Sequence, residues 1–137
     1  KALAAEATLQ SIVFGFDTVV IVDDLVLGKP TSADHAVEML GLLAGRRHEV
    51  CTAIAIASHR DVLAAEFDVT AVYFKPVADQ QMLHYVKKGE RRGKAGAYGI
   101  QGTGGFLVDT IEGNLDTVIG LPRNLLDRMC AAILDKS

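Results

Sequence analysis

The chain has 137 residues, of which 50% are apolar and 23% charged. It is therefore long enough for one domain with an ordinary core, and too apolar to stay disordered. The net charge of −3 and the interrupted basic stretch at residues 87–94 argue against a nucleic-acid-binding surface. The two cysteines, Cys51 and Cys130, are too few for a disulfide framework and lack the spacing of a zinc site. We expect a cytoplasmic protein, because the chain shows neither a signal-peptide pattern nor the roughly 20-residue apolar run of a membrane span.

The first half of the chain predicts one helix end, a strand and a second helix. Residues 1–9 are rich in Ala, Glu and Leu, as at the end of a helix. Residues 11–22 are dominated by Ile, Val and Phe and predict a buried strand. Thr31 or Ser32 can cap the next helix, which ends at Gly45.

The second half predicts more strands than helices. Residues 49–57 and 67–74 read as neighbouring strands, and residues 79–88 as a surface helix. Residues 97–101 and 105–111, followed by a turn and residues 118–121, predict a twisted antiparallel ribbon. Residues 123–134 form an amphipathic helix. Because several β runs follow one another directly, an α/β fold with a mixed sheet and flanking helices is favoured over a purely parallel sheet.

Asp17 is the first candidate for chemistry. It lies within a run of Val, Ile and Phe, where a carboxylate that loses its hydration needs compensation. A metal ion, a metal-bound water or a lysine such as Lys29 would provide it. The alternative is a carboxylate that caps or ends a strand, and position alone leaves both interpretations open.

Lys29 stands in a Gly-Lys-Pro sequence that resembles the tail of a phosphate loop. The upstream glycine and the following Ser or Thr of a Walker motif are missing, so that motif is excluded. Lys29 can still neutralise a phosphate, or it can be a solvated lysine in a turn.

The glycines at residues 96, 99 and 102 do not have Rossmann spacing, and no helix follows them. Gln101 lies among them, and its amide could bind the edge of a base or serve a structural purpose. The four histidines are scattered along the chain and are expected to be structural. No sequence pattern supports a nucleophilic acyl transfer.

Five segments, taken in order, resemble the Maf family of nucleoside triphosphate pyrophosphatases. They are Phe16–Val20 (FDTVV), Gly28–Pro30 (GKP), Gly45–Thr52 (GRRHEVCT), Lys94–Gly102 (KAGAYGIQG) and Val118–Pro122 (VIGLP). The resemblance implies a two-lobed α/β fold like that of inosine triphosphate pyrophosphatases, with the nucleotide between the lobes. It also implies metal-dependent cleavage between the α- and β-phosphates.

The resemblance carries roles onto individual residues. It implies that Asp17 is the catalytic proton acceptor and a possible metal ligand, with Mg²⁺ or Mn²⁺ as cofactor. Lys1 and Lys29 match lysines near the phosphates. Thr18 and Gln101 match positions for base selection, in the branch acting on dTTP and UTP rather than on 7-methyl-GTP. A homodimer is also implied, with no nucleic-acid or membrane partner.

Two departures from the family pattern accompany the resemblance. Family members begin with a serine-rich, double-arginine phosphate loop and an acidic segment, and about fifty residues of that kind are absent before Lys1 by comparison with the resemblance. We therefore expect residues 1–137 to be a single, N-terminally truncated domain. Gly93 replaces the usual aspartate before Lys-Ala-Gly. The alternatives to an active enzyme are a regulatory protein of septum formation and a nucleotide-binding domain without turnover.

Overall fold

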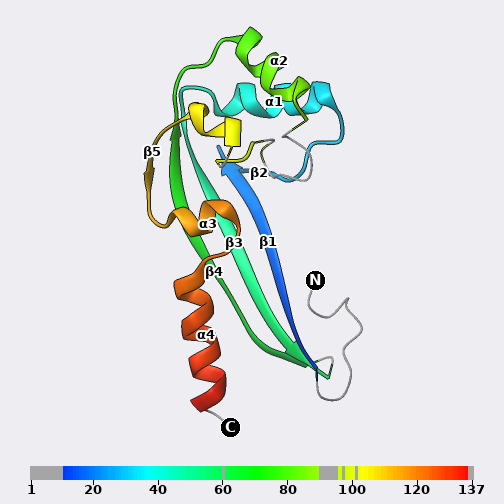
Figure 1. The fold of residues 1–137 in the computed structure, drawn as a ribbon, viewed down its shortest axis with the longest axis vertical. Coiled ribbons are helices and arrows are strands. Elements are labelled where there is room, and N and C mark those ends of the chain that lie inside the picture. Colours follow the sequence, from blue (N-terminus) through cyan, green and yellow to red (C-terminus); the bar gives the residue numbers. More distant parts are fainter. Residues whose placement is uncertain (1–10, 60, 90–95, 97, 101, 136–137) are drawn as a thin grey trace.

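The computed structural model describes residues 11–59, 61–89, 96, 98–100 and 102–135, and for residues 102 and 103 the backbone alone. A long twisted sheet runs the length of the molecule and carries helices along it (Figure 1). The elements are β1 (Ile12–Val22), β2 (Leu25–Leu27), α1 (Ala33–Leu43), β3 (Arg47–Ser58), β4 (Asp61–Phe74), α2 (Asp79–Lys87), the 3₁₀ helix η3 (Gly102–Leu107), β5 (Val108–Glu112), α3 (Leu115–Ile119) and α4 (Arg123–Asp135).

The strand order is β2-β1-β3-β4-β5, and each neighbouring pair is antiparallel. The three long strands β1, β3 and β4 form the body of the sheet, whereas β2 pairs with the last three residues of β1 only. That pairing ends where Leu27 meets Val20. In the described part of the chain, β1 therefore has one edge without a partner strand from Ile12 to Val19.

Helices cover one face of this sheet. Side chains alternate along a strand and direct cross-strand partners share a face, so the partners Val20, Val50 and Thr70 point to the same side. Two apolar clusters form on that side. The upper cluster joins the strands to α1 and α2, and the lower cluster joins Ile54 and Ile56 to Leu125 and Met129 of α4. We call this side the helix face.

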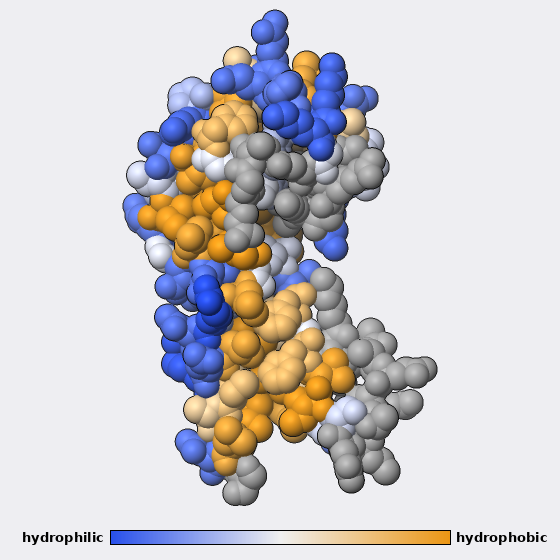
Figure 2. All heavy atoms as spheres, in the orientation of Figure 1, coloured by the Kyte–Doolittle hydropathy of each residue, from blue (hydrophilic) through white to orange (hydrophobic). Residues whose placement is uncertain are grey.

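The opposite side, which we call the open face, carries the odd-numbered residues of β1 and β3 in the lower half. Its side chains are more exposed: Phe67 of β4 shows 66% of its surface and Val69 shows 39%. Apolar residues also reach the molecular surface in the lower half of Figure 2. The core is thus one-sided.

Most of the predicted elements are confirmed. The α/β class with flanking helices, the strand at residues 11–22 and the helices at residues 79–88 and 123–134 agree with the structure. Ser32 caps α1, because its Oγ accepts a hydrogen bond from the backbone N–H of His35 at 3.0 Å. The helix predicted for residues 1–9 lies outside the described residues. None of the helices described is both long and apolar enough to cross a membrane.

The predicted ribbon beyond residue 97 is wrong in two places. Residues 102–107 form η3, and Val118 and Ile119 end the helix α3 instead of forming a strand. Their β-branched side chains favour a strand, but Gly120 takes a left-handed conformation (φ 103°) that caps the helix. The tertiary bonds of Thr117 described below then outweigh the local preference.

Candidate active site

Asp17 lies at the centre of the open face. Its cross-strand partner is Ala53, which is paired with Phe67 in turn. These residues border a hollow of about 290 Å³, lined by Gly15, Phe16, Asp17, Ala53, Ile54, Ala55, Ala65, Glu66 and Phe67. The Asp17 residue is exposed, so the expectation that it loses its hydration inside an apolar run is wrong. Its apolar neighbour Phe16 points to the helix face, where it packs against the lower cluster, and the carboxylate does not.

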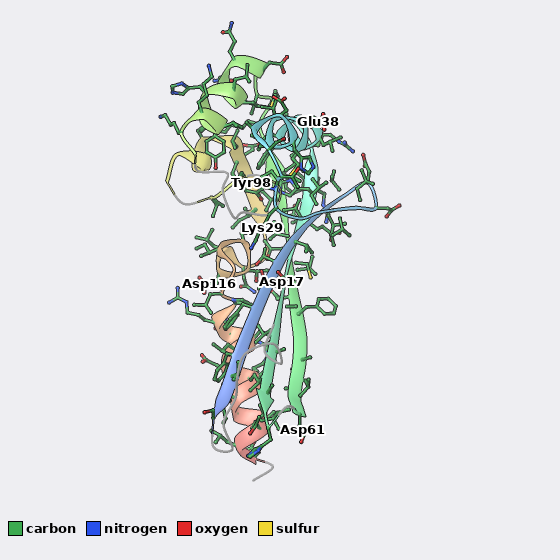
Figure 3. All side chains as sticks on the ribbon, turned by 90° about the vertical axis from the view of Figure 1, so that its right-hand side faces the viewer. Asp17, Lys29, Glu38, Asp61, Tyr98 and Asp116 are labelled. Atoms are coloured by element: carbon green, nitrogen blue, oxygen red, sulfur yellow. The ribbon has the colours of Figure 1, made fainter. Side chains whose placement is uncertain are left out.

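Lys29 comes to the same level of the sheet as Asp17. Leu27, the last residue of β2, pairs with Val20, and Lys29 follows two residues beyond that end of the strand. Figure 3 agrees, since it shows Lys29 and Asp17 at neighbouring heights along β1. Lys29 is exposed. A cation and a carboxylate therefore lie beside the unpaired edge of β1, where a phosphate chain can approach both.

The glycine-rich segment meets the residues around Lys29. The backbone N–H of Gly96 donates to the carbonyl of Gly28 at 3.1 Å. A side chain at residue 96 would begin 2.8 Å from Val20 Cγ2, and its φ of +69° is left-handed. Glycine at this position therefore lets one of the five segments contact two others, those of Val20 and Gly28.

Thr18 points to the helix face, opposite to Asp17. Its Oγ1 lies 2.8 Å from Oγ1 of its cross-strand partner Thr52, which donates to the carbonyl of Thr117 at 2.8 Å. Gly120 lies against the same hydroxyl, because a Cβ there would be 3.3 Å from Thr18 Oγ1. Thr18 is half-buried, whereas Thr52 and Thr117 are fully buried. The hydrogen bonds of Thr52 thus connect α3 to β3 next to Thr18.

A buried aromatic cluster holds the next part of the glycine-rich segment. Tyr98 Oη lies 2.7 Å from His48 Nε2, and both rings pack edge-on against Phe74. Burial, with the charge of Arg47, lowers the pKa of His48 to about 4, so its imidazole is neutral at pH 7. Burial raises the pKa of the Tyr98 hydroxyl. The expectation that His48 is structural fits this position in the core.

Tyr85 of α2 also contacts the glycine-rich segment, through its hydroxyl group. Its hydroxyl accepts a hydrogen bond from the backbone N–H of Gly99 at 2.9 Å. Gly104 passes so close that an added Cβ would lie 1.9 Å from the Gly99 carbonyl oxygen and 2.9 Å from Tyr85 Oη. No side chain fits there, so glycine at residue 104 allows the backbone to pass close to the backbone of Gly99.

Of the predicted site residues, the structure places Asp17 and Lys29 at neighbouring heights of the molecule and Thr18 on the face opposite Asp17. Lys1, Gln101 and the substituted Gly93 lie outside the described residues. Sequence reasoning did not find Thr52 or Tyr85. The signal for Thr52 was a hydroxyl residue in the middle of an apolar strand, which needs a partner when it is buried.

The described residues offer few ligands for a metal ion. Within the described ranges, no group of three or more His, Cys, Asp and Glu side chains is placed to hold a metal ion. A magnesium ion does not need three protein ligands, because one or two carboxylates, substrate phosphates and water can coordinate it. The exposed Asp17 fits that pattern as a single carboxylate ligand.

Comparisons with known proteins show which family the chain resembles. The sequence profile of the family described as "Maf-like protein" matches residues 1–133. A protein of Pectobacterium atrosepticum named dTTP/UTP pyrophosphatase is 46% identical over 124 residues, which cover 89% of this chain and 62% of that protein. A protein of the same name from Photorhabdus laumondii subsp. laumondii is 47% identical, covering 89% and 63%. A third, from Escherichia coli O157:H7, is 44% identical, covering 89% and 61%.

The chain thus spans about three fifths of the length of these curated relatives. The match to the family profile extends over nearly all of the chain, and it includes each of the segments that form the edge of β1 and its surroundings. The chain belongs to the Maf-like protein family.

Proposed function

We propose that this chain provides the catalytic carboxylate and the base-reading strand of a nucleoside triphosphate pyrophosphatase acting on dTTP and UTP. The observation that carries the proposal is the placement of Asp17 and Lys29 at one level of the unpaired edge of β1, with Thr18 on the opposite face. The names of the relatives support the same activity.

In this mechanism Asp17 is the general base. It accepts a proton from a water molecule whose oxygen forms a bond to the α-phosphorus, while the bond from that phosphorus to the bridging oxygen breaks. The products are the nucleoside monophosphate and pyrophosphate. An exposed carboxylate can reach such a water, and general-base help typically gives about 10²–10⁴-fold in rate. Lys29 neutralises charge on the phosphate chain.

A divalent metal, Mg²⁺ or Mn²⁺, belongs to the proposal. When bound, it would neutralise phosphate charge, with Asp17 as a protein ligand beside the phosphate oxygens. Thr18 and Gln101 are proposed to read the pyrimidine base, and Lys1 to assist at the phosphates. We also place the protein in the cytoplasm as a homodimer.

The test is pyrophosphate release from dTTP, UTP, CTP and 7-methyl-GTP with Mg²⁺ or Mn²⁺, comparing the chain with its Asp17→Asn and Asp61→Asn variants. We expect dTTP and UTP turnover to fall by about 10²–10⁴-fold in Asp17→Asn, because the base is lost. Asp61→Asn is the matched control, since that exposed residue begins β4 far from the site (Figure 3).

Two results would contradict the proposal. Turnover that survives Asp17→Asn would remove this carboxylate from catalysis. Tight dTTP binding without pyrophosphate release would favour a nucleotide-binding domain. A role in septum formation would instead show as partner binding that is indifferent to Asp17→Asn.

A further inference from the structure

Three buried threonines connect the strands to the segment from β5 to α3. Thr52 and Thr70 are each completely buried, and each donates its hydroxyl proton to a backbone carbonyl of that segment: Thr52 to Thr117 at 2.8 Å, and Thr70 to Asn114 at 3.1 Å. Thr117 donates its own hydroxyl to Asp68. Thr52 alone of these three also contacts β1, through Thr18.

The direction of the hydrogen bond between Thr18 and Thr52 follows from counting protons. A threonine hydroxyl has one proton to donate and two lone pairs to accept with. The carbonyl of Thr117 can only accept, so it takes the proton of Thr52. Thr52 can then only accept from Thr18, and the Thr18 hydroxyl must donate its proton inward.

The outward side of Thr18 therefore has lone pairs only. Thr18 is half-buried, so the packing around it does not seal the residue from solvent. With its proton held by Thr52, it offers an acceptor and no donor. Gly120 is the neighbour of the same oxygen, since a Cβ added there would lie 3.3 Å from Thr18 Oγ1.

We infer that Thr52 is a specificity-determining residue that fixes Thr18 as a hydrogen-bond acceptor and thereby selects bases with a ring N–H. Uracil and thymine carry a proton on N3 and can donate it to Thr18. Cytosine has an unprotonated N3, which is itself an acceptor and would face the lone pairs of Thr18. The inference rests on the proposed function, because it assumes that the base reaches the Thr18 side of β1.

The size of the effect follows from one hydrogen bond. A site that pairs with a base loses affinity for an analogue that leaves its polar groups unpaired, and a single such loss is worth about tenfold or more. We therefore expect the chain to prefer uracil over cytosine nucleotides by about tenfold or more, and the preference to depend on a residue that does not itself touch the base.

The experiment measures binding of the α,β-methylene analogues of UTP and CTP by calorimetric titration, since these analogues cannot be cleaved between the α- and β-phosphates. The variants are Thr52→Val, which keeps the shape and removes the hydroxyl, and Thr52→Ser, which restores it. Thr70→Val is the matched control, because Thr70 is equally buried and binds the same segment without contacting β1. Thermal unfolding of each variant shows that it is folded.

We expect the preference for the UTP analogue to fall to within about twofold in Thr52→Val and to be kept in Thr52→Ser and Thr70→Val. If Thr52→Val does not fold, Thr18→Val removes the acceptor from the half-exposed partner instead and should abolish the preference equally. A preference that persists in these variants, or that is absent in the unaltered chain, overturns the inference. If the unaltered chain shows the preference and Thr52→Val loses it, the inference is upheld even when the unaltered chain releases no pyrophosphate from UTP. That lack of release would refute the proposed enzyme activity alone.

Discussion

The two faces of the long strands are built from the same backbone but differ in what covers them. The helix face carries both apolar clusters and the buried threonines, whereas the open face carries Asp17, an exposed Phe67 and a hollow. Asp17 and Thr18 are neighbours in sequence and yet belong to different faces. One step along a strand therefore separates the residue proposed for chemistry from the residue proposed for base reading.

The largest expected effect tests whether stability resides on the helix face. Met129 is 1% exposed in the lower cluster and Phe67 is 66% exposed on the open face. We expect Met129→Ala to lower the free energy of unfolding by about 2–5 kcal/mol, because it leaves a cavity, and Phe67→Ala by about 0.5 kcal/mol or less. Urea unfolding measures both. Equal losses would mean that the open face is packed as tightly as the other.

A second prediction concerns the buried imidazole of His48 on the helix face. Its pKa in the folded chain is about 4, against 6.5 for the free side chain. Between these values the unfolded chain binds more protons, so stability is lost as the pH falls from about 6.5 to 4, by roughly 2–3 kcal/mol. Urea unfolding at several pH values should show this loss in the unaltered chain.

The matched variants for this pH dependence are His48→Phe and His84→Gln. His48→Phe should lose that part of the pH dependence, because no imidazole remains in the core. His84→Gln should keep it, since His84 is exposed on α2. A slope that is the same in His48→Phe and in the unaltered chain would show that other groups cause it.

The smallest expected effect concerns base choice. Gln101 lies outside the described residues. We expect Gln101→Ala to change the ratio of dTTP to 7-methyl-GTP turnover by about tenfold, or about 1.4 kcal/mol, because one amide contact to the base is lost. Pyrophosphate release from the two nucleotides measures the ratio. An unchanged ratio would remove Gln101 from base selection and leave that role to Thr18.

Much of the fold could be predicted from the sequence because local signals and packing agree there. The run at residues 11–22 is a strand by composition, and Ser32 begins α1 by its hydroxyl. The strand β4 begins at Asp61, six residues before the predicted run, because residues 62–65 pair across the turn at His59. Alanines in that stretch gave no strand signal.

The site was predictable in part. The segments predict Asp17, Thr18 and Lys29 as site residues, and their roles stay predictions; the pairing of β1 with β3 puts Asp17 opposite Ala53 and Thr18 opposite Thr52. Their division between two faces was not foreseen, because the apolar run around Asp17 suggested burial on both sides. Thr52 could not be assigned its part from sequence, because its partners lie 34 and 65 residues away.

The hairpin of β3 and β4 has a consequence for the order in which the molecule assembles. Ser58 pairs with Asp61 across a very short connection, and the two strands then pair along almost their whole length. Local pairing of this kind closes early, because it costs little chain entropy. The strand β1 joins only across the long excursion through α1, with β3 as its full-length partner. We therefore expect the carboxylate of Asp17 to reach its place late in folding, on a template that is already formed.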